Sequence, residues 1–119
     1  MDIETYSRLA RRTAPEGYTW REDVTHASLG IGWEAGEIQD HVKKAAFNDR
    51  IFDHNHVVAE VGDLMWYLNL LVDSIGTTWD HVLSVNIAKL EARYPDMKFD
   101  SIRSLNRDLA AEKAAMELV

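Results

Sequence analysis

Apolar residues recur every three or four positions over most of the chain, which is the spacing of one face of an α-helix. The pattern predicts a short helix over residues 3–12 and long helices over 23–46 and 57–75. A fourth helix is expected over 79–94, because Pro95 cannot continue it. No segment alternates as a half-buried strand does, so the sequence predicts an all-α protein.

The segments between the predicted helices carry residues typical of turns and caps. Residues 47–55 are rich in Asn and Asp and predict a loop, and Gly76 suits the left-handed position that follows a helix. Thr77, with Asp80 three residues later, is expected to cap the fourth helix. Residues 101–117 are polar and rich in alanine, which predicts a last helix that forms an arm on a neighbouring subunit or a loosely packed end.

The predicted architecture is an antiparallel bundle of about four to five helices, folded as a single domain over residues 1–119. A chain of 119 residues supports only a small core. Apolar residues nevertheless extend around the long helices beyond one stripe, as Val42, Met65, Val72 and Ile75 illustrate. We therefore expect a homo-oligomer, either a homodimer or a dimer of dimers.

Two pairs of acidic residues lie where the apolar stripes predict a core. Glu34 and Glu37 are three residues apart in one predicted helix. Glu60 and Asp63 have the same spacing in the next, and residues three apart share a helix face. The stripes that contain the first member of each pair are Ala27, Ile31, Glu34, Ile38 and Val57, Glu60, Leu64, Leu68. An ionised carboxylate at such a position needs a partner, because burying it alone is costly.

A divalent cation is the partner that the acidic pairs favour. Converging carboxylates raise one another's pKa unless a cation neutralises them, and hard oxygen ligands suit Mg²⁺, or Mn²⁺ in its place. The alternative is that the acids are merely solvated or form salt bridges, as most charged helical residues do. A di-iron site is disfavoured, because neither Glu34 nor Glu60 has the histidine three residues later that such sites use.

The spacing of these acids, Glu34-x-x-Glu37 followed after twenty-two residues by Glu60-x-x-Asp63, resembles the ExxE…ExxD pattern of the all-α nucleoside triphosphate pyrophosphohydrolases, the MazG-like superfamily. Residues 60–68, EVGDLMWYL, are similar to that family's third-helix signature. The resemblance implies an enzyme that hydrolyses a nucleoside triphosphate to the monophosphate and pyrophosphate with Mg²⁺. All four acids would then be metal ligands and catalytic residues.

The resemblance continues into the fourth predicted helix. Residues 86–95, NIAKLEARYP, are similar to the family's fourth-helix continuation, so the resemblance covers about 24–95 and leaves 96–119 as a C-terminal extension. It implies a role in nucleotide-pool sanitation or control, with a deoxynucleotide or a modified nucleotide as substrate. Members often carry a further Glu directly before the first motif, where this chain has Trp33. Trp33 and Trp66 are expected in the core, where large aromatics at helical spacing usually pack, and the alternative is that they stack on a base.

Four further residues are candidates for substrate binding. Asn86, Lys89 and Arg93 form one polar stripe, whose amide and cations suit a base, a sugar and phosphates. The spacing alone favours an ordinary exposed face, but the resemblance reverses this for Asn86 and Lys89, which match positions that contact substrate. Tyr67 lies one turn after Asp63, and its hydroxyl is expected to reach either the nucleotide or a partner in the core.

Composition narrows the function classes further. The formal charge of −7 argues against a surface for nucleic-acid polymers, which rests on clustered Lys and Arg. The absence of cysteine excludes disulfides and thiolate metal sites. The chain has no apolar run long enough for a bilayer and no signal segment, so we expect no membrane contact and a cytoplasmic location. Two alternatives stay open: a non-catalytic metal-dependent nucleotide-binding module, and a helical oligomeric interaction protein.

Overall fold

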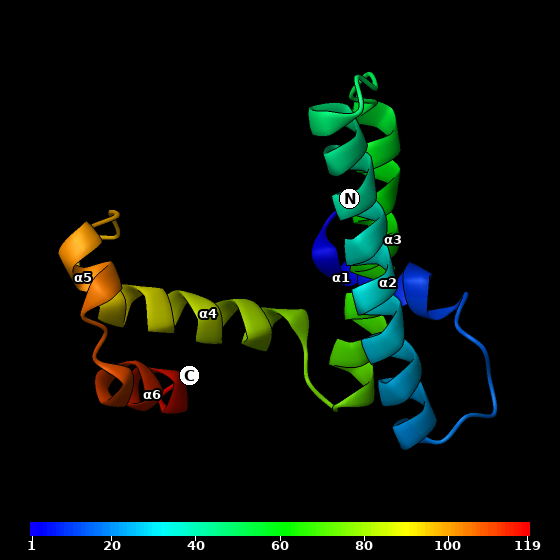
Figure 1. The fold of residues 1–119 in the computed structure, drawn as a ribbon. Coiled ribbons are helices and arrows are strands. Elements are labelled where there is room, and N and C mark those ends of the chain that lie inside the picture. The colour runs from blue at the N-terminus through cyan, green and yellow to red at the C-terminus, as the bar shows by residue number, and fades with distance from the viewer. The chain divides into compact units, whose positions relative to one another are not determined.

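The computed structural model describes all residues 1–119 and contains helices and no strands, which confirms the predicted all-α class. The six helices are α1 (Ile3–Arg11), α2 (Trp20–Phe47), α3 (His54–Ser74), α4 (Trp79–Arg93), α5 (Ser101–Leu105) and α6 (Leu109–Glu117) (Figure 1). They form two compact units, Met1–Gly76 and Thr77–Val119, so the single domain expected from the sequence stays a prediction. None of the helices combines the length and the apolar character needed to cross a membrane.

Each helix begins after an acidic or hydroxyl residue whose side chain accepts a hydrogen bond from the backbone three residues later. Thr19 and Asp53 cap α2 and α3 in this way, so both helices begin three residues earlier than the apolar pattern predicted. The cap expected at Thr77 is wrong. Thr78 caps α4 instead, and its hydroxyl accepts from the His81 N–H at 3.2 Å.

The C-terminal segment is not one helix over 101–117, as the sequence suggested, but two. The Asn106 side chain donates to the Ile102 carbonyl at 2.9 Å and closes α5, while Asp108 accepts from the backbone and opens α6. Alanine-rich composition predicted helix throughout, but these two side chains compete locally with helical hydrogen bonds. The chain therefore has six helices rather than four or five.

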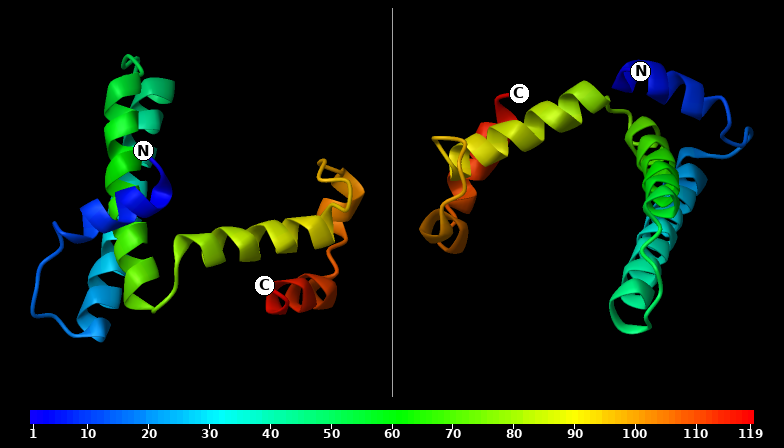
Figure 2. Two further views of the ribbon diagram at one scale, coloured as in Figure 1. Left: turned by 180° about the vertical axis from the view of Figure 1, so that it is seen from behind. Right: turned by 90° about the horizontal axis from the view of Figure 1, so that it is seen from above.

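In the first unit, α2 and α3 lie side by side and run in opposite directions, and α1 crosses α3 (Figure 1 and Figure 2). Side chains hold this crossing in place. Arg11 Nε lies 2.8 Å from the Asp73 carboxylate and its Nη2 lies 3.5 Å from Asp23, while Asn69 Nδ2 donates to the Ser7 carbonyl at 3.2 Å. The chain leaves α3 through a left-handed residue at Gly76, with φ of +71°, which confirms that prediction.

Small residues of α2 allow a bulky side chain of α3 to pack against the helix backbone. A Cβ atom at Gly30 would lie only 2.1 Å from Tyr67 Cδ1, so the Tyr67 ring occupies the space that a side chain would need. Ala27 is fully buried and Leu70 is 2% exposed. They are the only buried apolar residues of the chain, so its core is narrow.

In the second unit, α4 packs against α6, and a buried acid lies between two arginines. The Glu112 side chain is 3% exposed. Arg93 Nε donates to it at 2.9 Å and Arg107 Nε at 3.0 Å, and each guanidinium makes a second hydrogen bond to the same carboxylate. Hydrogen bonds from Arg107 and then Arg93 hold the pKa of Glu112 far below its usual value and raise the pKa of both arginines.

The packing of Tyr67 on Gly30 predicts opposite effects for two glycine substitutions in α2. Gly30→Ala must displace the Tyr67 ring and should destabilise the protein by about 1–3 kcal/mol. Gly32→Ala meets no atom within 4 Å and should stabilise it by about 0.5–1 kcal/mol, because alanine restricts the unfolded chain. Urea unfolding followed by circular dichroism measures both. Equal changes for the two variants would contradict the close contact.

Neutralising the buried acid of the second unit should destabilise the protein, whereas neutralising an exposed acid of the same helix should not. Glu112→Gln removes the buried charge that pairs with Arg93 and Arg107 and should lower the melting temperature by about 5 °C or more. Glu117→Gln is the matched control, because its contact with Lys113 is long and exposed. The pKa of Glu112 is lowered from 4.5. The loss of melting temperature in Glu112→Gln should therefore be largest above pH 4.5 and shrink below it. Calorimetry against pH tests this.

Candidate functional site

Three of the four predicted acids meet where α2 and α3 pack together. One carboxylate oxygen each from Glu34 on α2 and from Glu60 and Asp63 on α3 lies within 4.8 Å of the others. Glu34 and Glu60 are partly buried, while Asp63 is exposed. The three carboxylates define the acidic cluster, and it exists because two helix faces that carry acids pack against each other.

The acidic cluster has an unusual charge balance. Burial raises the pKa of Glu34, and a hydrogen bond to Glu60 adds to this by favouring the protonated form. The negative charges of Asp63, Glu60 and Glu37 raise it further. The basic group beside the cluster is His56, whose Nε2 lies 3.4 Å from Glu60 Oε1. The arrangement therefore favours either a bound proton or a bound cation.

The donor set of the acidic cluster fits Mg²⁺ or Mn²⁺. All three groups offer hard carboxylate oxygens, and they belong to helices that hold them at short mutual distance. Mg²⁺ in proteins is usually held by one or two carboxylates and keeps several waters for substrate oxygens to replace. Asp63 is exposed, so one side of the cluster is accessible to such a substrate. The metal predicted from the sequence is thus compatible with the residues present.

A surface hollow of about 440 Å³ lies beside the acidic cluster. It is lined by Thr13, Glu34, Asp63, Trp66 and Tyr67. Trp66 Nε1 donates to Thr13 Oγ1 at 2.7 Å, which ties the loop after α1 to the middle of α3. The hollow thus combines two acids with an aromatic wall that is fixed by a hydrogen bond.

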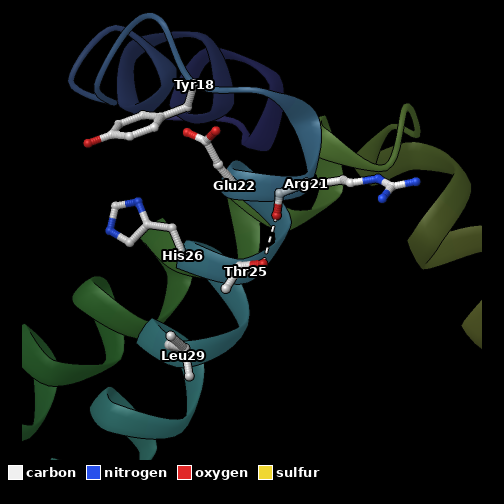
Figure 3. Close-up of a pocket in the computed structure, with 6 residues that line it drawn as sticks. All are labelled: Tyr18, Arg21, Glu22, Thr25, His26 and Leu29. Atoms are coloured by element: carbon white, nitrogen blue, oxygen red, sulfur yellow. Dashed lines mark hydrogen bonds between the residues drawn. The ribbon is translucent and has the colours of Figure 1, made fainter.

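A second hollow, of about 420 Å³, lies near the start of α2 and is lined by Tyr18, Arg21, Glu22, Thr25, His26 and Leu29. Figure 3 shows the Tyr18 ring, the Glu22 carboxylate and the His26 ring gathered around one space, while the Arg21 side chain points away from it. The His26 ring also packs edge-on against Trp66 and Tyr67, with centroids 6.2 and 5.6 Å away. These rings form a continuous wall from the second hollow to the acidic cluster.

The other predicted site residues are distributed between the two units. Glu37 is partly buried on α2 and adds negative charge near Glu34, but it is not part of the acidic cluster. Asn86 and Lys89 lie on α4 in the second unit, so their contact with substrate stays a prediction. Arg93 is paired with Glu112 within that unit.

The expectation that both tryptophans belong to the core is wrong for Trp33. Trp33 is 70% exposed, because its position lies about a quarter turn around α2 from the buried residues Ala27 and Gly30. Trp66 is partly buried and hydrogen-bonded. The spacing of apolar residues marks both tryptophans as hydrophobic, but it does not show which of the two points toward the buried side of its helix.

Sequence reasoning missed three residues that shape the site: Thr13, His26 and Gly30. Thr13 lies outside the predicted helices, and its contact with Trp66 joins residues far apart in the chain. His26 shares no metal-ligand spacing with another histidine, so the sequence assigns it no role. A glycine inside a long predicted helix was the one available signal, since such glycines often mark close packing.

Comparison with known proteins relates the chain to a phage protein. No family model matches the chain, and no solved structure matches it either. The Gene 37 protein of Mycobacterium phage L5 is 32% identical over 76 residues, and the match covers 60% of this chain and 67% of the phage protein. At that identity and coverage, the chain belongs to the same family as the Gene 37 protein of this phage.

Proposed function

We propose that the protein is a Mg²⁺-dependent hydrolase that cleaves a nucleoside triphosphate between its α- and β-phosphates and releases the monophosphate and pyrophosphate. The single observation that carries the proposal is the acidic cluster. Its three carboxylates lie within 4.8 Å of one another, and Glu34 has a raised pKa. A purely structural cluster would usually pair its acids with lysine or arginine. The basic group beside this cluster is instead the His56 ring, 3.4 Å from Glu60. The reaction itself comes from the ExxE…ExxD resemblance.

Glu34, Glu60 and Asp63 would hold the metal. Bound there, Mg²⁺ would neutralise the triphosphate and polarise its phosphoryl oxygens. Glu37 lies one turn after Glu34 but outside the acidic cluster, so its carboxylate is the one left to orient the attacking water and accept its proton. Tyr67 lines the adjacent hollow and supplies a hydroxyl for a phosphate or sugar oxygen.

Two residues of α4, Lys89 and Asn86, are proposed to bind different parts of the substrate. Lys89 would stabilise the charge that develops on the pyrophosphate leaving group, and Asn86 would contact the base or sugar. Both assignments follow from the resemblance. Arg93 is not proposed as a substrate-binding residue, because its guanidinium makes two hydrogen bonds to the buried Glu112 carboxylate. Moving Arg93 to a phosphate would leave that acid with one of its two cations.

The substrate class we favour is a deoxynucleotide or a modified nucleotide, with nucleotide-pool sanitation or control as the biological role. The alternatives are a module that binds nucleotides with metal but does not cleave them, and a helical interaction protein. A screen of common, deoxy and modified triphosphates separates the three. The hydrolase releases pyrophosphate only with Mg²⁺, the module binds without turnover, and the interaction protein does neither.

Loss of a ligand in the acidic cluster should abolish turnover without unfolding the chain. Glu34→Gln and Asp63→Asn keep the side-chain shape but each removes one charge, and a lost metal ligand should lower kcat/KM by at least about 100-fold. Asp40→Asn is the control, because this acid of α2 is half exposed and pairs with Lys44. Pyrophosphate release with Mg²⁺ measures the effect. Near-normal turnover in both cluster variants would refute the proposal.

The raised pKa of Glu34 predicts an effect on stability that does not depend on catalysis. The folded state favours protonated Glu34, so ionisation costs stability as pH rises from the usual pKa of 4.5 through the higher folded value. Glu34→Gln should therefore raise the melting temperature of the metal-free protein at pH 7 and not at pH 4. Mg²⁺ should raise the melting temperature of the unmodified chain more than that of the variant. Differential scanning fluorimetry with EDTA or Mg²⁺ gives both comparisons.

A further inference from the structure

The second hollow, near the start of α2, is lined by two rings and a carboxylate that take no part in the acidic cluster. Glu22 and His26 are one turn apart and share a helix face, and Tyr18 lies just before the helix. Figure 3 shows the Tyr18 ring above one space and the His26 ring below it, with the Glu22 carboxylate at the edge. The volume of about 420 Å³ is in the range of sites for small molecules.

The Glu22 carboxylate has no cationic partner in the chain. None of the salt bridges involves it. The side chain of Arg21 points away from the hollow, and its guanidinium carbon lies 5.6 Å from the centroid of the Trp20 ring. The Thr25 hydroxyl donates to the Arg21 carbonyl at 2.7 Å, so its hydrogen is used within the helix. The oxygens of Glu22 are therefore available to hydrogen-bond donors of a ligand.

The second hollow lies within one nucleotide length of the acidic cluster. His26 and Glu34 are eight residues apart on α2, which is about 12 Å along the helix axis. The His26 ring packs against Trp66 and Tyr67, and both of these line the hollow beside the acidic cluster. A nucleotide with its phosphates at the acidic cluster can therefore place its base in the second hollow.

We propose that the second hollow binds the base of the substrate and that Glu22 selects guanine. The nucleotide class rests on the proposed function, whereas the choice of base rests on the hollow alone. Every base has a flat face that stacks on aromatic rings, so Tyr18 and His26 accept any of them. Selection must come from Glu22, because a carboxylate group accepts hydrogen bonds and donates none when it is ionised.

A carboxylate distinguishes the bases by the donors on their edges. Guanine presents two adjacent donors, N1–H and the N2 amino group, which match the two oxygens of one carboxylate. Adenine and cytosine present an amino group beside a ring nitrogen that accepts, and uracil and thymine present one N–H between two carbonyl oxygens. In these four bases an acceptor faces a carboxylate oxygen, so one hydrogen bond is lost and repulsion replaces it. Guanine nucleotides therefore fit the second hollow best.

Nucleoside monophosphates in EDTA test base recognition without metal or turnover. The unmodified chain should bind GMP at least about 10-fold more tightly than UMP in titration calorimetry, since a site built to hydrogen-bond a base rejects one that leaves the site unpaired. The imidazole proton resonances of His26, assigned with His26→Gln, should shift when GMP is added, because the base would stack on this ring.

Glu22→Gln should reverse the preference. The amide offers one acceptor and one donor, which match N3–H and O4 of uracil and lose one of the two contacts with guanine. GMP affinity should fall at least about 10-fold, while UMP affinity should not fall. Asp40→Asn is the control, because it makes the same change of carboxylate to amide on α2 at an acid that pairs with Lys44. Circular dichroism checks that each variant is folded, and Glu22→Ala, which should also lose the preference, replaces Glu22→Gln if that variant is not.

Each outcome decides for or against the base site. No binding of GMP at millimolar concentration, equal binding of GMP and UMP, unmoved His26 resonances, or an unchanged preference in the Glu22 variant would overturn it. Pyrophosphate release with Mg²⁺ separates this proposal from the proposed function. Equal kcat/KM for dGTP and dUTP would overturn the base site and leave the hydrolase. Selective binding of GMP without release of pyrophosphate from any triphosphate would overturn the hydrolase and leave the base site.

Discussion

The rest of this structure depends on the antiparallel contact between α2 and α3. Ala27 is fully buried in it, and the absence of a side chain at Gly30 admits the Tyr67 ring. The same contact carries the Glu34 carboxylate to those of α3, although like charges at short distance repel. Apolar contacts and ring packing along the rest of the pair must therefore offset the repulsion between these carboxylates. A bound proton or cation would relieve that repulsion.

Acids and apolar residues share the stripes along which α2 and α3 pack. Glu34 lies on the stripe of Ala27 and Ile38, and Glu60 lies on the stripe of Val57 and Leu64. The core of this small hairpin is narrow, since its buried apolar side chains are those of Ala27 and Leu70. The packing that forms this core therefore also sets the spacing of the carboxylates.

The sequence predicted the features that depend on local periodicity and not those that depend on contacts between distant residues. The four main helices follow from apolar spacing, and Glu34, Glu60 and Asp63 follow from acids placed on apolar stripes. The exposure of Trp33 was missed, because a rotation of about 100° separates buried from exposed on a helix. The pairing of Arg93 was missed for a different reason. Its partner Glu112 lies in another helix, and no pattern within the chain links them.

The chain holds buried acids in two contrasting ways, and the contrast bears on function. Glu112 is 3% exposed, and two arginines lower its pKa by direct hydrogen bonds, so its charge is fully compensated within the fold. Glu34 is partly buried beside other acids, and its pKa is raised. A fold that can place two guanidinium groups on one carboxylate could have compensated the other in the same manner. The cluster at Glu34 has no such group, so its negative charge would be neutralised by an external cation, which is what the proposed metal-dependent reaction on a polyphosphate would use.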